Sequence, residues 1–207
     1  MRQVYRSYDK RFDRSEFQFS FCPRCGSVLE HMVGGEAITR CVKCGFAQYL
    51  NPLPGVSVLV EDQPGKILVG ARRHTASKGT VSWCFPCGYI DYREDFLTAA
   101  HREVKEETNL DVEIRSIVNV GSNHHSPDKH ALVVVLFAVV RDNSESCRPG
   151  DDMVDIRWLS RHSRRPPMEF AADKDMFDLW RNGQLMHFPV DARFAIRERG
   201  ATNGQPV

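Results

Sequence analysis

The amino-acid sequence predicts an α+β protein in which an α/β sandwich follows a small cysteine-rich module. Four cysteines near the N-terminus form two Cys-x-x-Cys pairs, and from Val56 onward short apolar runs alternate with two segments of helical pattern. Strands, a helix, more strands and a final helix, in that order, suit a sheet covered by helices. The 207 residues are enough for one medium domain and a small accessory module.

The cysteine-rich module is predicted over residues 21–50, after a polar arm at residues 1–20. Its cysteines are Cys22, Cys25, Cys41 and Cys44, and a Gly follows the second Cys of each pair. Four thiolates at this spacing are typical of a zinc ribbon that holds one structural Zn²⁺. We expect a hairpin turn at Gly34-Gly35. A module of this size builds little core, so we expect it to fold only with metal bound.

Strands are predicted where β-branched residues cluster or apolar residues alternate. These runs are 56–60, 67–71, 112–120, 132–140 and 155–159. The first two flank a Pro-Gly turn and predict a hairpin. The continuous apolar run at 132–140 predicts a strand buried on both faces. Residues 75–83 are expected to form a loop that leads to Trp83.

Helices are predicted at 96–108 and 170–180. Asp95 is a good N-cap for the first helix, because its side chain can accept hydrogen bonds from the first free N–H groups. Leu97, Ala100 and Val104 form the apolar stripe expected to be buried. The second helix carries Phe170, Phe177 and Trp180. Residues 183–207 are predicted to be a C-terminal tail, flexible from about Ala192.

Charge and hydropathy exclude several classes of protein. The net charge is +1, so the overall balance does not call for nucleic acid or a membrane surface as partner. The longest apolar run, Ala131–Val140, is half of the roughly 20 residues that span a bilayer. The first residues lack the apolar region of a secretory signal, and an odd count of seven cysteines argues against a disulfide scaffold. We therefore expect a cytoplasmic protein.

Three carboxylates lie close together near the end of the first predicted helix. Glu103, Glu106 and Glu107 are spaced i, i+3 and i+4, so they share one sector of the helix surface. Like charges at this spacing destabilise a helix. A divalent cation would remove the repulsion, and hard cations such as Mg²⁺ prefer carboxylate oxygens. The alternative is a solvated helix face that pairs with Arg102 and Lys105.

The segment around these glutamates resembles the signature of the Nudix hydrolases, G-x5-E-x7-R-E-U-x-E-E-x-G-U, in which U is aliphatic. The matching residues are Gly88, Glu94, Arg102, Glu103, Val104, Glu106, Glu107 and Leu110. Asn109 stands where the family has Gly, and because Asn also adopts the left-handed conformation we expect the helix to end in the same turn. The resemblance implies an α/β/α sandwich with a mixed sheet over residues 54–182.

The resemblance also implies roles for individual residues. Glu103, Glu106 and Glu107 match the catalytic carboxylates that bind Mg²⁺ or Mn²⁺, and Glu106 and Glu107 are both candidates for the general base. The backbone carbonyl of Cys87 and the carboxylate of Asp152 match further ligands. For Asp152, a surface loop acid is an equal alternative. The residues that match the positions bracing loop and helix are Gly88, Glu94 and Arg102.

Weaker signals come from residues expected near the cleft. Arg72 and Arg73 end a predicted strand and are candidates for holding a phosphate, with strand-end solubility as the alternative. His124, with His125 and His130, lies in a predicted polar loop, and Asp155 lies close to Asp152. These are candidate substrate contacts, although ordinary surface histidines are the more common case.

Cys84 and Cys87 form a third Cys-x-x-Cys. Its Trp-x-x-Pro-x-Gly frame is the usual approach to the Nudix signature, which favours an ordinary strand-to-loop segment over a redox pair.

A zinc ribbon ahead of a Nudix signature resembles the subgroup of NADH pyrophosphatases and of FAD and ADP-ribose pyrophosphatases. The NADH enzymes carry Ser-Gln-Pro-Trp after the signature, and residues 119–127 lack it. We therefore expect hydrolysis of a nucleoside diphosphate linked to another moiety, such as ADP-ribose or FAD. The alternatives are an NADH or NAD-capped RNA pyrophosphatase and an inactive nucleotide-sensing regulator. The expected partner is a small nucleotide, capped RNA is the nucleic-acid alternative, and the family allows a homodimer.

Overall fold

The computed structural model describes residues 19–29, 38–49, 51–63, 65–73, 79, 81–126, 129–141 and 147–190. Most of the predicted N-terminal arm, most of the predicted tail and the predicted Gly34-Gly35 turn lie outside these residues. No helix within the described ranges is long and apolar enough to cross a membrane.

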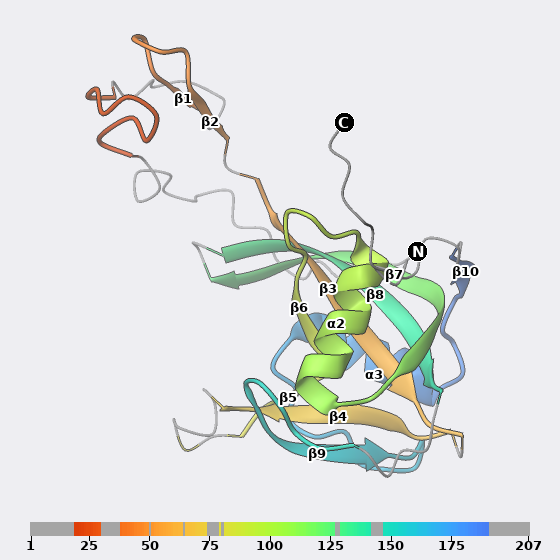
Figure 1. Ribbon diagram of the computed structural model, residues 1–207. Helices are drawn as coiled ribbons and strands as arrows, with labels where there is room; N and C mark the ends of the chain where they lie inside the picture. Colours follow the sequence, from red (N-terminus) through yellow and green to blue (C-terminus); the bar gives the residue numbers. More distant parts are fainter. Residues whose placement is uncertain are drawn as a thin grey trace, which may run out of the picture.

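The described strands form a two-stranded ribbon and one eight-stranded sheet (Figure 1). The strands are β1 (Ile38–Arg40), β2 (Ala47–Tyr49), β3 (Leu53–Glu61), β4 (Ile67–Arg72), β5 (Trp83–Cys84), β6 (Cys87–Tyr89), β7 (Val112–Ser126), β8 (Lys129–Val140), β9 (Met153–Leu159) and β10 (Phe188–Pro189). The large sheet has the order β10-β7-β8-β3-β4-β5, with β6 on β3 and β9 on β4. Because β3 runs parallel to β8 and antiparallel to β4 and β6, the sheet is mixed, as expected.

Helices α2 (Phe96–Thr108) and α3 (Ala171–Arg181) cover opposite faces of the sheet (Figure 1). The alternation along β3 explains the two layers, because successive side chains of a strand point to opposite faces. Val56, Val58 and Val60 pack in the core that contains α2, whereas Leu59 packs in the core that contains α3. The predicted α/β/α sandwich is confirmed.

Helix α2 has the bounds and caps that the sequence predicts. The Asp95 carboxylate accepts hydrogen bonds from the backbone N–H groups of Leu97 (2.8 Å) and Thr98 (2.9 Å). Asn109 ends the helix with φ 61° and donates its N–H to the carbonyl of Lys105. The left-handed turn therefore survives the replacement of the usual Gly by Asn.

One loop prediction is wrong. The strand predicted to end at residue 120 continues to Ser126, and β8 begins at Lys129, so His124 and His130 are backbone register partners in a strand pair and do not lie in a polar loop. The loop predicted to lead to Trp83 is found in its described residues 79, 81 and 82, and β5 begins at Trp83 itself. Ladder hydrogen bonds come from the backbone, so polar side chains along an antiparallel pair do not end it.

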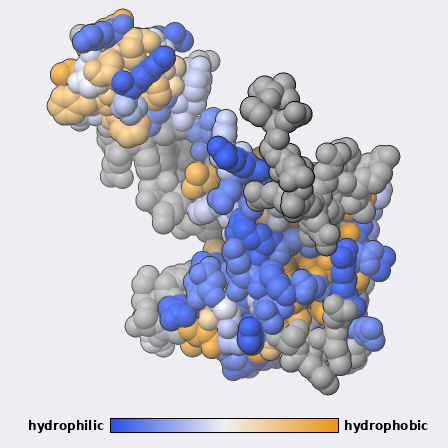
Figure 2. Space-filling model, viewed as in Figure 1, coloured by the Kyte–Doolittle hydropathy of each residue, from blue (hydrophilic) through white to orange (hydrophobic). Residues whose placement is uncertain are grey.

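The surface of the cysteine-rich module differs in polarity from the surface around α2. The outer side of α2 is mainly hydrophilic, whereas apolar side chains gather on the cysteine-rich module (Figure 2). Exposed apolar residues on that module include Phe21, Val28 and Val42. The module therefore buries only a small core, made of Cys22, Leu29 and Cys41 with partly buried neighbours.

Candidate active site and metal centre

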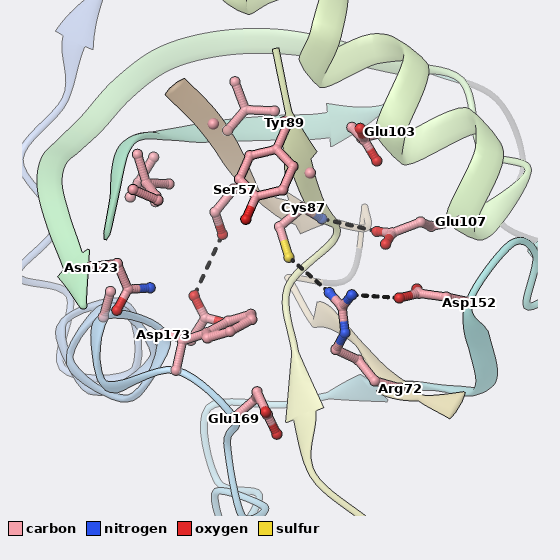
Figure 3. A pocket seen from close by; sticks show the side chains of 18 of the residues that line it. Ser57, Arg72, Cys87, Tyr89, Glu103, Glu107, Asn123, Asp152, Glu169 and Asp173 are labelled. Atoms are coloured by element: carbon pink, nitrogen blue, oxygen red, sulfur yellow. Dashed lines mark hydrogen bonds and ion pairs between the residues drawn. The ribbon is translucent and has the colours of Figure 1, made fainter. Parts of the chain in front are cut away.

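A cavity of about 440 Å³ opens at one end of the large sheet. Its walls come from β3, β6, the C-terminal half of α2, the β7–β8 pair, the turn at 151–152 and the segment 169–173 (Figure 3). A volume of this size lies in the range of small-molecule sites. The cavity thus brings together side chains that are more than 100 residues apart in the sequence.

Two glutamates of α2 form one wall of the cavity. Glu103 and Glu107 are 7% and 2% exposed, and both line the cavity. Glu107 accepts a hydrogen bond from the backbone N–H of Cys87 at 2.9 Å. Burial raises the pKa of Glu107 to about 9 and also raises the pKa of Glu103. Burial therefore outweighs the ion pair of Glu103 with Arg102 and the hydrogen bond of Glu107 from Cys87, and disfavours the charged form of both carboxylates.

Arg102 ties the loop before α2 to the helix. Its guanidinium donates to both oxygens of Glu94, at 2.7 and 2.9 Å, and to the backbone carbonyl of Tyr89 at 3.0 Å. It also bonds Glu103 (2.7 Å) and Glu106 (3.1 Å). The hydrogen bonds from Arg102 lower the pKa of Glu94. The planar fork of Arg suits such a set of acceptors, and Lys could not replace it.

Gly88 lets the loop approach the helix. A Cβ at this position would overlap the carboxylate of Glu103. The Gly is therefore required by the close passage of β6 beside the acidic wall, since its φ is not in the left-handed region. Any side chain here would displace Glu103 from the cavity.

Asp152 and Arg72 form an ion pair in the cavity wall. The other terminal nitrogen of Arg72 donates to the Cys87 sulfur at 3.6 Å. Oδ1 of Asp152 is buried and has no hydrogen-bond partner among the described residues. The loop that carries Asp152 is held over the end of α2, because Gly150 donates its N–H to the Glu107 carbonyl at 3.0 Å. Asp152 is thus a cavity residue.

Several other sequence candidates lie elsewhere. Glu106 is half-exposed, does not line the cavity and pairs with Arg102. Arg73 is exposed and bonds the carbonyl of Asp151, and Asp155 pairs with Arg157. His124 lies on β7, and its side chain is outside the described part of the structure. The Cys84 side chain is buried, and its thiol lies 3.9 Å from the Gly70 carbonyl.

Sequence reasoning missed four polar residues of the opposite wall, Ser57, Asn123, Glu169 and Asp173. One signal was available for Asp173. It occupies the first position of the buried stripe of α3, which continues at Met176, Phe177 and Trp180. An acidic residue in an apolar stripe marks a buried carboxylate that needs partners.

The acidic wall fits a hard divalent cation by its chemistry. Its donors are carboxylate oxygens, the Glu107 carboxylate is buried, and Oδ1 of Asp152 has a free lone pair. These oxygens are not gathered around one point, because Arg102 holds Glu103 and Glu106. Among the described residues, only the four cysteines form a set whose ligand atoms all lie within 4.8 Å of one another.

The cysteine set fits a tetrahedral ion by its geometry. The sulfurs of Cys22 and Cys44, and those of Cys25 and Cys41, are 3.6 Å apart. With Zn–S bonds of about 2.3 Å, the sulfurs of a tetrahedral centre lie about 3.8 Å apart. The two halves of the module repeat one turn, in which Gly26 and Gly45 have φ of 69° and 73° and donate to the carbonyl of the first Cys. Positive φ explains why Gly follows each pair.

A model of the NUDIX domain matches residues 51–180 of the chain. The chain is 28% identical over 142 residues to the ADP-ribose pyrophosphatase of Methanocaldococcus jannaschii, which covers 67% of this chain and 80% of that protein. It is 28% identical over 148 residues to the NAD-capped RNA hydrolase NudC of Haemophilus influenzae, covering 72% of this chain. The match spans only 54% of that relative's length.

Solved structures resemble the fold. A NUDIX hydrolase from Nitrosomonas europaea superposes with a TM-score of 0.68 and 23% identity, covering 82% of this chain and 97% of that one. An ADP-ribose pyrophosphatase from Streptococcus suis superposes with a TM-score of 0.51 and 20% identity, covering 64% of this chain and 92% of that one. Identities this low establish the architecture alone.

Proposed function

The chain belongs to the Nudix family and is a Nudix pyrophosphohydrolase, and from this premise we propose that it cleaves the diphosphate bond of a nucleoside diphosphate linked to another moiety. ADP-ribose and FAD are the substrates expected. The observation that carries the proposal is the cavity of about 440 Å³ with Glu103 and Glu107 on one wall. It offers room for a nucleotide beside an acidic surface. The similarity to an enzyme named ADP-ribose pyrophosphatase supports this choice.

We propose that Mg²⁺ or Mn²⁺ is held by the acidic wall. The proposed ligands are Glu103, Glu106, Glu107, Asp152 and the backbone carbonyl of Cys87. Glu106 belongs to this set because Arg102 holds its carboxylate beside that of Glu103. Such a cation, when bound, neutralises charge on the phosphate oxygens and lowers the pKa of a water molecule.

The protein's own residues position the substrate and accept a proton. Arg72 places a positive charge in the cavity wall, where it suits a phosphate oxygen. A glutamate of the acidic wall takes the proton of the attacking water, and Glu106 and Glu107 are both candidates. For Glu107 this requires a nearby positive charge, because its pKa is raised to about 9 and a general base must be ionised. Gly88, Glu94 and Arg102 keep loop and helix in place.

A product assay tests the proposal. The wild-type chain is incubated with ADP-ribose, FAD, NADH, dinucleoside polyphosphates and NAD-capped RNA, with Mg²⁺, with Mn²⁺ or with a chelator, and the mononucleotides released are measured by chromatography. We expect metal-dependent release of AMP from ADP-ribose or FAD. Glu107→Gln should lose at least about 10³-fold in turnover, as expected when a charge that acts in the transition state is removed. Glu113→Gln, an exposed glutamate on β7 paired with Arg115, is the matched control. Full turnover by Glu107→Gln would show that the site is assigned wrongly.

The second candidate is hydrolysis of NADH or of NAD-capped RNA. The relatives named NAD-capped RNA hydrolase favour it, although residues 119–127 lack the Ser-Gln-Pro-Trp motif. An assay with capped RNA and ADP-ribose in competition distinguishes the two functions. A capped-RNA hydrolase should have a higher kcat/KM on capped RNA than on ADP-ribose. A nucleotide-sensing regulator would bind the nucleotide and release no product.

We propose that the cysteine centre binds one structural Zn²⁺. The sulfur distances support a tetrahedral ion, and four thiolates without an open position suit a structural role. A cytoplasmic location and a homodimer stay predictions, to be checked by fractionation of cells and by light scattering.

A further inference from the structure

The wall of the cavity across from the glutamates carries polar side chains from three different elements. Ser57 comes from β3, Asn123 from β7 and Asp173 from the first turn of α3 (Figure 3). Ser57 and Asp173 are only 4% and 2% exposed. The proposed chemistry at the diphosphate does not use any of the three.

The hydrogen bonds of Asp173 are directed from the protein onto its carboxylate. Ser57 donates its hydroxyl to Oδ1 at 3.5 Å, and the backbone N–H of Phe85 donates to Oδ2 at 3.1 Å. A carboxylate has about four acceptor positions, so some remain for a ligand. Ser57 has one hydrogen, which points to Asp173, so its free lone pairs are acceptors as well. With Asp173 ionised, the two side chains present only acceptors to the cavity.

Burial of this carboxylate needs an explanation. Asp173 lies at a stripe position that an apolar residue would fill without penalty, and burial raises its pKa to about 7. The N-terminal end of α3 and two donors offset only part of the desolvation. The burial of the Asp173 carboxylate at the cavity wall is explained if a bound ligand donates further hydrogen bonds to it.

The charges of the cavity are divided between its ends. Arg72 lies on the side of the glutamates, next to Asp152 and Cys87, whereas Asp173 and Glu169 lie on the other side (Figure 3). The charge of Arg72 still reaches Asp173 and lowers its pKa, although burial outweighs this effect. A diphosphate is repelled by the ionised form of Asp173 and attracted by Arg72 and by a cation on the acidic wall. An uncharged, donor-rich part of the substrate is therefore the part that suits the far side.

We propose that Ser57 and Asp173 form a specificity subsite that accepts hydrogen bonds from an uncharged N–H or O–H group of the substrate, and thereby orients the diphosphate toward Arg72. The donor is a base amino group or a sugar hydroxyl. This inference rests on the proposed function, because it names the residues that recognise the substrate beyond its diphosphate.

The test combines protein variants with substrate analogues. Wild type, Asp173→Asn and Ser57→Ala are each assayed with ADP-ribose and three analogues: the hypoxanthine form without the base amine, the 2′-deoxyadenosine form, and the ADP methyl ester without the terminal sugar. We expect wild type to favour ADP-ribose over one analogue by about 10- to 100-fold in kcat/KM. Asp173→Asn should lose about that factor on ADP-ribose, mainly through KM, and little on that analogue. The analogue that is affected identifies the donor.

The controls separate recognition from folding. Asp178→Asn makes the same change on the same helix at a surface ion pair with Arg165 and Arg181, and should leave all four activities unchanged. Ser57→Ala removes a single oxygen, so it carries the test if Asp173→Asn does not fold. An equal loss on all four substrates by the folded variant overturns the subsite and leaves the proposed function intact. Absence of turnover by wild type overturns the proposed function and this inference with it.

Discussion

Replacing Glu107 by Gln is expected to abolish turnover and, in the absence of divalent cations, to increase the stability of the fold. The carboxylate is buried against Cys87 and its pKa is raised from 4.5 to about 9. Gln has nearly the same shape, and its amide oxygen can still accept the hydrogen bond from the Cys87 N–H. The substitution therefore removes a charge with little change in packing.

The magnitude follows from linkage between protonation and folding. Between pH 4.5 and 9 the folded state keeps a proton on Glu107 that the unfolded state has lost, so stability falls as pH rises through this range. Each pKa unit corresponds to about 1.4 kcal/mol. From pH 4.5 to pH 7 the wild type should therefore lose about 3 kcal/mol relative to Glu107→Gln. Asp173, whose pKa is raised to about 7, adds its own pH dependence to both proteins and cancels in the difference.

Urea unfolding at a series of pH values, with a chelator present, measures this difference. Addition of Mg²⁺ should then stabilise the wild type and have little effect on Glu107→Gln, because a ligand stabilises only the state that binds it. A pH-independent difference between the two proteins would refute the account of Glu107 as a buried, poorly compensated acid. Equal stabilisation by Mg²⁺ would refute its assignment as a ligand.

Three further predictions concern the cysteine module, the loop before α2 and the end of α2. Elemental analysis should find about one zinc per chain, and Cys22→Ser should lose both the metal and the thermal transition of the module. A folded wild type without zinc would contradict this. Gly88→Ala should lower kcat/KM at least about 10-fold, because the new Cβ displaces Glu103; unchanged kinetics would mean that the loop moves aside. At Asn109, with φ 61°, Ala should lower the free energy of unfolding by about 1 kcal/mol, whereas Gly should not lower it. Equal unfolding midpoints for Ala and Gly would count against this.

Local patterns allowed the sequence to predict much of the fold. Helix α2 and its caps depend on residues within one or two turns, and their predicted bounds match the structure. The predicted end of the next strand was wrong, because pairing of β7 with β8 as far as Ser126 depends on two backbones that the sequence does not bring together by pattern alone. The clustering of the acidic residues of α2 could also be predicted from the sequence, because all of them lie on one helix.

The opposite wall of the cavity is a different case. Ser57 and Asp173 are 116 residues apart and meet only when α3 packs on the sheet. Ser57 is the polar residue of the apolar run 56–60, but the sequence alone does not show that it faces a cavity or meets Asp173. Arg72, the last residue of β4, lines the cavity, whereas Arg73 follows the strand and bonds the carbonyl of Asp151. The sequence does not show which of the two adjacent arginines reaches the cavity.

The strand that forms part of the cavity wall begins close to the end of the cysteine module. Only four residue steps separate Tyr49, the last residue of β2, from Leu53, the first residue of β3. Their Cα atoms can therefore be no more than about 15 Å apart. With so short a tether, whatever docks on the exposed Phe21 or Val42 stays within a few nanometres of Gly55 and Ser57, at an effective concentration on the order of millimolar. The reach of the module from the cavity wall is thus limited by a single short stretch of backbone.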